Sequence, residues 1–222
     1  SSSVYFAFAD RLNVSERDPL PRKPANAYAA SKRIAERIVE DASARGLQTV
    51  ILRPRAVFGP GDATLFPRLL RANRSRGIPI MRGGDTWLDL TYADNVVDAL
   101  ALACAAPDDA CGRIYNLSNG EPVKLIDLLR NVFELLRMPL RLRTVPRSAA
   151  LAAGRAFEWL YRALPMLGDE PPFTRYTVGL LAYSQTLDIS EARRRLGYEP
   201  RISMNEGMRR FAEDWRNRND VG

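Results

Sequence analysis

Residues 25–54, ANAYAASKRIAERIVEDASARGLQTVILRP, carry two local patterns from which the fold class follows. Residues 25–45 have the periodicity of a helix, and Gly46 fits a C-terminal cap. The apolar run that follows at residues 47–54 is typical of a strand buried on both faces of a parallel sheet. A helix that leads directly into a buried strand indicates an α/β protein.

The rest of the chain continues the alternation of strands and helices. We expect a strand at residues 1–6, a loop at 10–24, a helix at 65–76, a short strand at 78–81, an extended run at 87–92 and a helix at 93–106. Residues 112–139 read as strand, turn and helix, and after residue 140 come a long helix (149–167), a Pro-rich loop (168–176), a short strand (185–190) and two short helices. The expected sheet is mostly parallel. Residues 1–140 form its main part, and residues 141–222 a smaller, partly helical substrate-binding subdomain.

Composition narrows the chemistry that the chain can perform. The 222 residues contain no histidine, which excludes Ser-His-Asp and Cys-His catalysis and histidine-ligated zinc, so acid–base work falls to Tyr, Lys, Asp or Glu. The two cysteines, Cys104 and Cys111, have no metal-like spacing; we expect no metal, no disulfide framework and a cytoplasmic, reducing location.

The chain is basic, with a net charge of +7 and a pI near 9.8. Its arginines alternate with acids, as in DISEARRRLGYEP at residues 188–200, so we expect no nucleic-acid partner and a solvated basic face instead. The most apolar long stretch, residues 149–167, is interrupted by Arg155, Glu158 and Arg162 and reads as an amphipathic helix rather than a membrane span. Peripheral membrane contact and a homodimer are both compatible with this sequence.

The helix at residues 25–45 places Tyr28 one turn before Lys32, with three small residues between them. A free tyrosine has a pKa of about 10 and is a poor base at neutral pH. A fixed ammonium nearby favours the phenolate, which makes the pair a candidate site of proton transfer. A surface helix with a tyrosine on its apolar edge is the alternative, and this spacing alone does not decide between them.

Six stretches, in this order, resemble the extended short-chain dehydrogenase/reductase superfamily over nearly the whole chain. They are SSSVYF, YAASK, LRPRAVFGPGD, LDLTYADNVVDALALA, RIYNLSNGEPVKLIDLL and DISEARRRLGYEP. The resemblance implies the C-terminal part of a Rossmann-type, doubly wound parallel sheet, starting at its fifth strand, and NAD or NADP as cofactor.

The resemblance also implies roles for named residues. Tyr28 would be the general acid/base, and Lys32 would hold the nicotinamide ribose. Ser1, with Ser2 as the fallback, would hydrogen-bond the substrate oxygen. A cofactor-side loop would lie beside the nicotinamide, and Arg55 within it could instead contact substrate or serve as an ion-pair partner. The residues of this loop are Pro54, Arg55, Ala56 and Val57.

Two departures from the family pattern bear on these expectations. Phe6 stands where the family usually has glycine, and the Gly-rich turn that holds the cofactor pyrophosphate does not occur in the chain. The chain also begins without methionine, within what reads as a strand. We therefore expect a fragment that lacks its N-terminal cofactor-binding part and is inactive as a dehydrogenase alone.

Two substitutions bear on the substrate. Members that act on nucleotide sugars have asparagine at the position of Ala56 and arginine at that of Leu88, and neither side chain here can pair with a diphosphate. LRPRAVFGPGDATLFPRLL resembles instead the branch of 3β-hydroxysteroid and sterol dehydrogenases. We expect an oxidoreductase that interconverts a hydroxyl and a ketone on an apolar small molecule. A nucleotide-sugar epimerase or dehydratase is one alternative, and a non-catalytic dinucleotide-binding sensor is another.

Overall fold

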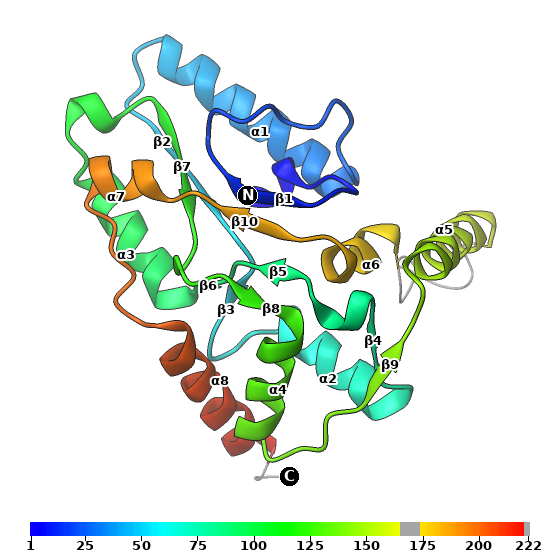
Figure 1. The fold of residues 1–222 in the computed structure, drawn as a ribbon. Coiled ribbons are helices and arrows are strands. Elements are labelled where there is room, and N and C mark those ends of the chain that lie inside the picture. Colours follow the sequence, from blue (N-terminus) through cyan, green and yellow to red (C-terminus); the bar gives the residue numbers. More distant parts are fainter. Residues whose placement is uncertain (165–173, 220–222) are drawn as a thin grey trace.

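A computed structural model describes residues 1–164 and 174–219 of the chain (Figure 1). Its α-helices are α1 (Ala27–Ala44), α2 (Leu65–Ser75), α3 (Ala93–Cys104), α4 (Leu125–Leu135), α5 (Arg147–Ala163), α6 (Arg175–Ala182), α7 (Ser190–Leu196) and α8 (Met204–Asn219). Its strands are β1 (Arg11–Val14), β2 (Val50–Pro54), β3 (Val57–Phe58), β4 (Ile78–Ile80), β5 (Trp87–Leu88), β6 (Thr91–Tyr92), β7 (Arg113–Leu117), β8 (Val123–Lys124), β9 (Leu142–Thr144) and β10 (Gln185–Leu187). Three short 3₁₀ helices are η1 (Ser2–Tyr5), η2 (Arg82–Gly84) and η3 (Asp108–Ala110).

The strand pairs are mostly parallel, as the apolar strand pattern predicts. β2 pairs with β7 in parallel, from Val50 opposite Arg113 to Pro54 opposite Leu117. A four-stranded sheet has the order β1-β10-β5-β8, in which only the β5–β8 pair is antiparallel. In Figure 1 the β2–β7 pair passes between α1 on one side and α3 with α7 on the other. The α/β fold class is confirmed.

The prediction for the first residues of the chain was wrong. Residues 1–6 were expected to be a strand, but Ser2–Tyr5 form a 3₁₀ helix whose first backbone amide, that of Ser3, is capped by the hydroxyl of Ser1. The expected loop at residues 10–24 contains the strand β1, which pairs with β10 from the other end of the chain. A partner so distant in sequence leaves no local pattern, so β1 could not be recognised from its own residues.

The C-terminal region differs from the expectation in two helices. The expected Pro-rich loop ends inside α6, whose N-cap Thr174 forms a reciprocal capping box with Thr177. The last helix, α8, is long rather than short because its apolar positions pack into the main core. The expected helix at residues 149–167 corresponds to α5, and residues 165–167 lie outside the described residues, as do 168–173 of the expected loop.

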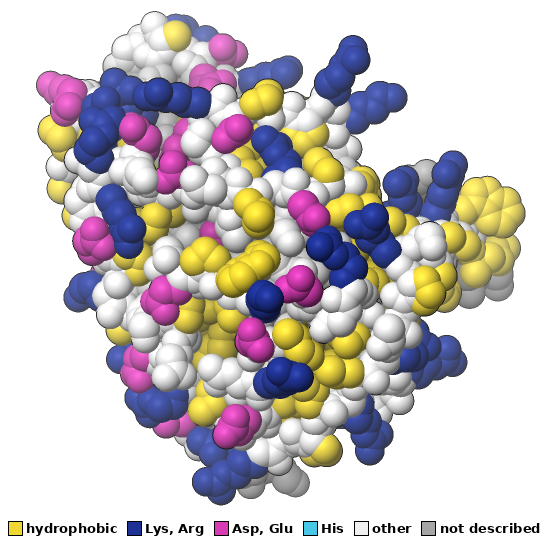
Figure 2. Space-filling model, viewed as in Figure 1, with side chains coloured by type: hydrophobic (Ala, Val, Ile, Leu, Met, Phe, Trp, Pro, Cys, Tyr) yellow, Lys and Arg dark blue, Asp and Glu magenta, His cyan; other side chains and the backbone are white. Residues whose placement is uncertain are grey.

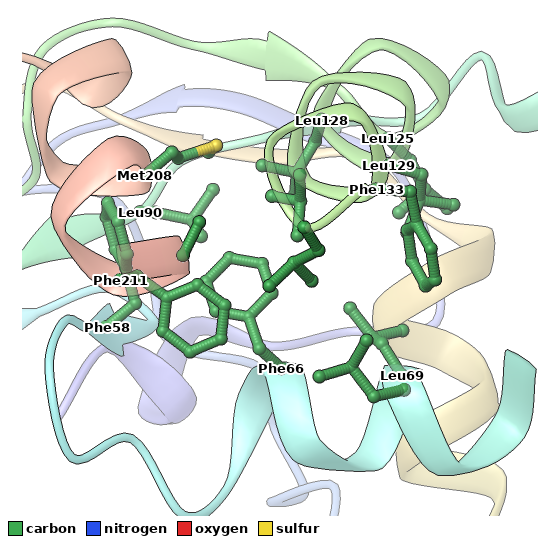
Figure 3. Close-up of a cluster of buried hydrophobic side chains, with 14 of the residues drawn as sticks. Phe58, Phe66, Leu69, Leu90, Leu125, Leu128, Leu129, Phe133, Met208 and Phe211 are labelled. Atoms are coloured by element: carbon green, nitrogen blue, oxygen red, sulfur yellow. The ribbon is translucent and has the colours of Figure 1, made fainter. Parts of the chain in front are cut away.

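The largest core lies between α2, α4 and α8, and β3 and β6 contribute to it. Figure 3 shows Phe58, Phe66 and Phe211 meeting across it, with the leucines of α4 above them. The rings of Phe66 and Phe211 lie 4.4 Å apart between centroids, although they come from distant parts of the chain. Ala56 and Phe58, which follow β2, pack in this core, so the core holds the segment after β2 in place.

Gly207 lies within α8 where the helix meets this core. An added Cβ would stand 2.7 Å from Cδ2 of Tyr92 and 3.1 Å from Cζ of Phe58, and both rings are buried. Alanine normally stabilises a helix interior by about 1 kcal/mol over glycine, but overpacking costs about 1–3 kcal/mol. We expect Gly207→Ala to lower the free energy of unfolding by about 1 kcal/mol in urea titrations. The exposed Asn205→Ala on the same helix is the control, and a Gly207→Ala protein as stable as this control would contradict the expectation.

α5 carries exposed apolar side chains at the edge of the molecule. Trp159 is 71% exposed, and Phe157, Leu160 and Leu164 are also exposed. Figure 2 shows hydrophobic side chains gathered where α5 protrudes. Within residues 1–164 and 174–219, no helix has both the length and the hydropathy that crossing a membrane requires.

Candidate active site

Tyr28 and Lys32 lie in the first turns of α1. The side chain of Asn26 caps this helix by accepting a hydrogen bond of 2.8 Å from the amide of Ala29, so the helix begins at a fixed point. The Lys32 ammonium lies 5.4 Å from the centre of the Tyr28 ring, as expected of residues one turn apart. Tyr28 is 53% exposed, and Lys32 is half-buried without an ion pair to a described residue. Both polar ends are therefore available to a ligand.

Ser1 and Lys32 line the same hollow of about 250 Å³, together with Glu36 and the outer face of β2. The Ser1 hydroxyl lies 2.9 Å from that of Ser3 and also caps η1. Ser2 is buried, and its hydroxyl donates to the carbonyl oxygen of Pro54 at 3.0 Å. Ser2 thus ties η1 to the end of β2, which leaves Ser1 as the better placed of the two serines.

The loop at residues 54–57 turns sharply after β2, where Ala56 has a φ of +43° in the left-handed region. This turn separates β2 from β3, which pairs with β6 through Val57 and Thr91. Ala56 and Leu88 are partly buried and pack against the large core. At these two positions the structure presents apolar surface.

A buried ion pair joins α1 to β2. Glu36 accepts two hydrogen bonds from Arg53, at 2.9 and 2.6 Å, and Arg53 also donates to the hydroxyl of Tyr5 and stacks 4.7 Å from its ring centre. Burial is the largest influence on the pKa of Arg53 and lowers it, but the hydrogen bonds and charges of Glu36 and Tyr5 together outweigh burial and raise this pKa. Because Glu36 is one turn after Lys32, this pair sets the position of the helix that carries Tyr28.

A second polar cluster lies beyond the end of β2. It consists of Arg55, Asp89 and Tyr176, from three distant segments. The pKa of Arg55 is lowered, mainly by burial. The charges of Tyr176 and Asp89 act in the opposite direction. Burial raises the pKa of Asp89 to about 6, although the amide of Leu187 and the charge of Arg55 lower it. Burial also raises the pKa of Tyr176, and Arg55 and Tyr28 are the two groups whose charges act on it.

Sequence reasoning named Arg55 but missed Asp89, Tyr176 and the Glu36–Arg53 pair. A signal existed for Arg53, which is a charge inside an otherwise apolar strand, and for Asp89, which interrupts the apolar run WLDLTY. Charges at such positions are usually paired or functional. Tyr176 had no signal, because it reaches the cluster from a segment that was expected to be loop. Among the described residues, no group of three or more His, Cys, Asp or Glu side chains could hold a metal ion.

The sequence pattern of the NAD dependent epimerase/dehydratase family matches residues 1–118, which is more than half of the chain. The chain belongs to this family. Membership confirms the expected resemblance. The cofactor of this family is NAD. The epimerase/dehydratase match spans η1 to β7 and so includes α1 with Tyr28 and Lys32 and the loop at residues 54–57.

The relatives of this chain include reductases and dehydrogenases. The 2-alkyl-3-oxoalkanoate reductase of Shewanella oneidensis is 35% identical over 94% of this chain and 57% of the relative. The decarboxylating sterol-4-alpha-carboxylate 3-dehydrogenase erg26 of Schizosaccharomyces pombe is 32% identical over 95% of this chain and 63% of the relative. The chain therefore spans less than two thirds of the length of either relative.

Among solved structures, MoeE5 in complex with UDP-glucose and NAD is 26% identical to this chain. It aligns with 100% of this chain and 64% of its own, with a TM-score of 0.70. The likeness confirms the Rossmann-type arrangement of an epimerase/dehydratase family member. It also shows that a protein of this fold holds NAD.

Proposed function

We propose that the protein interconverts a hydroxyl and a ketone on an apolar small molecule, with NAD or NADP as hydride carrier. The observation that carries this proposal is the pair Tyr28 and Lys32 on the first turns of α1, in a family that uses NAD, with the Lys32 ammonium over the Tyr28 ring. A half-buried ammonium without an ion pair fits a ligand rich in hydroxyl groups, such as the nicotinamide ribose.

In this proposal each residue has a separate task. Tyr28 takes the proton of the substrate hydroxyl during oxidation and returns it during reduction. Lys32 binds the ribose hydroxyls and favours the phenolate of Tyr28. Ser1 donates a hydrogen bond to the substrate oxygen. When bound, the nicotinamide supplies the hydride acceptor or donor.

The loop at residues 54–57 is proposed to border the nicotinamide. Its members are Pro54, Arg55, Ala56 and Val57. Tight tethering supports this placement, because Ser2 holds the Pro54 carbonyl and Thr91 holds the backbone of Arg55. A wall fixed in this way can orient a flat ring without moving during turnover.

The relatives support an apolar substrate. The Shewanella relative is named for a 2-alkyl-3-oxoalkanoate and the fission-yeast relative for a sterol carboxylate, and both names describe chemistry at a 3-oxo or 3-hydroxy carbon. Ala56 and Leu88, which pack against the large core, offer no charged group for a diphosphate. A nucleotide-sugar epimerase or dehydratase is the second candidate, supported by the fold shared with MoeE5. We further propose that residues 141–222 contribute mainly to the substrate side. Peripheral membrane contact and a homodimer stay predictions.

The test is substrate binding and turnover by the natural protein that contains these residues. With NAD or NADP present, it should oxidise long-chain or sterol-like secondary alcohols, followed by the absorbance of the reduced cofactor. Calorimetric titration with UDP- and dTDP-sugars should show no specific binding, because Ala56 and Leu88 cannot pair with a diphosphate. Tight binding of a nucleotide sugar would favour the epimerase instead.

A further inference from the structure

Arg55 is a buried arginine whose Nε has no hydrogen-bond partner among the described residues. Its side chain is 6% exposed, and its Nε is sealed from solvent without a hydrogen bond. Within residues 1–164 and 174–219, Nε is the nitrogen of this guanidinium that is both buried and without a hydrogen-bond partner. A buried charge without a partner is costly, so natural proteins rarely keep one that has no role.

The neighbours of Arg55 keep unpaired polar atoms of their own. Asp89 accepts a hydrogen bond of 2.7 Å from the amide of Leu187 through Oδ2, and its Oδ1 has no partner in the described part of the chain. On the adjacent strand β10, both polar atoms of the Gln185 side chain are also without partners. Since buried polar atoms are almost always hydrogen-bonded, this region is incomplete without a polar ligand.

Hydrogen bonds hold the backbone of Arg55 in a fixed position. Its amide donates to the carbonyl of Leu117 at 3.0 Å and to Oγ1 of Thr91 at 3.1 Å, and the same hydroxyl donates to the Arg55 carbonyl at 2.6 Å. Ala56, directly after it, keeps a left-handed backbone that few residues other than glycine adopt. The backbone is therefore held on both sides of the arginine.

We propose that Arg55 binds a carboxylate of the substrate, which one carbon separates from the carbon whose hydroxyl or ketone reacts with Tyr28. This rests on the proposed function. The charges of both Arg55 and Tyr28 act on Tyr176, which is consistent with one substrate reaching both groups. A planar guanidinium matches a carboxylate through two parallel hydrogen bonds.

The surroundings favour a singly charged group over a diphosphate. The charges that act on Arg55 are those of Tyr176 and Asp89, and no second cation is among them. Asp89, whose pKa burial raises to about 6, would take up a proton readily when a second carboxylate arrives beside Arg55. Once Asp89 is protonated, the single positive charge of Arg55 balances the single negative charge of one carboxylate.

The experiment compares a long-chain 2-alkyl-3-hydroxy acid with its methyl ester as substrates of the natural protein, with NAD present. The wild type should prefer the acid. Arg55→Met keeps the volume and removes the charge, so it should raise KM for the acid at least tenfold more than it raises KM for the ester. Arg55→Lys keeps the positive charge but loses the planar guanidinium. Its KM for the acid should lie between those of the wild type and Arg55→Met. Equal effects on acid and ester would overturn the proposal.

Two further readouts separate this proposal from the proposed function. Arg55→Met should melt at or above the temperature of the wild type, because it removes a buried charge whose Nε lacks a hydrogen-bond partner; a lower melting temperature would make Arg55 a structural residue and overturn the proposal. If the wild type oxidises neither compound, the proposed function fails, and calorimetry with a long-chain fatty acid and the matching primary alcohol decides the rest. Acid binding that is lost in Arg55→Met supports the carboxylate site, and acid binding that persists refutes it.

Discussion

Replacing Tyr28 by phenylalanine in the natural protein is expected to lower kcat by about 10²–10⁴-fold, the range that a positioned general acid/base contributes. The change removes one hydroxyl from a side chain that is 53% exposed, so neither the fold nor the packing of α1 should change. Binding of NAD, measured by fluorescence titration, should survive. Lys32→Ala should weaken both binding and turnover, because in the proposed mechanism the ammonium binds the ribose and favours the phenolate.

The matched control is Tyr161→Phe, which removes the same hydroxyl from α5. Its kcat should equal that of the wild type. If Tyr28→Phe kept near-normal turnover on a substrate that the wild type uses well, then Tyr28 would not be the proton carrier. The family membership would stand in that case, and another group near the Lys32 ammonium would have to do the work.

Breaking the buried pair between Glu36 and Arg53 is expected to cost about 3–5 kcal/mol of folding free energy, because either partner alone is left as an uncompensated buried charge. Arg53 is 3% exposed and Glu36 9%, so water cannot replace the lost partner. Arg53→Met and Glu36→Leu should each move the urea midpoint strongly downward. The double variant should recover most of the loss, since apolar side chains of similar volume can substitute for a buried pair.

The comparison pair is Arg209 and Glu206 on the surface of α8, linked at 2.8 Å. Arg209→Ala should hardly change the urea midpoint, because exposed ion pairs contribute little. If Arg53→Met behaved like Arg209→Ala, the Glu36–Arg53 pair would not hold α1 to β2. A double variant no more stable than the single ones would point instead to the hydrogen bond between Arg53 and Tyr5.

The sequence was most informative where structure is local. The helix α1 and the strand β2 were predicted to within a few residues, because the periodicity of one and the apolar run of the other are complete within their own segments. The pairing of Tyr28 with Lys32 follows from helix geometry alone. The roles assigned to Ser1 and to the loop at residues 54–57 came from the family resemblance and stay predictions.

What the sequence could not show depends on distant partners. The strand β1 exists because β10 lies beside it, and the Ser1 hydroxyl caps η1 by accepting from the amide of Ser3. The cluster around Arg55 draws Asp89 and Tyr176 from segments that no local pattern connects. A buried charge in an apolar run can be noticed in a sequence, but its neighbours cannot be named.

The largest core has a consequence for how the chain is made. Phe58 and Phe66 come from the first third of the chain, and Phe211, which packs against Phe66, lies close to its C-terminus. During synthesis on the ribosome, the aromatic face of β3 and α2 emerges long before α8 exists to cover it. Until α8 leaves the exit tunnel, the nascent chain carries an uncovered apolar surface. A chain that is stalled before α8 would therefore be prone to aggregation.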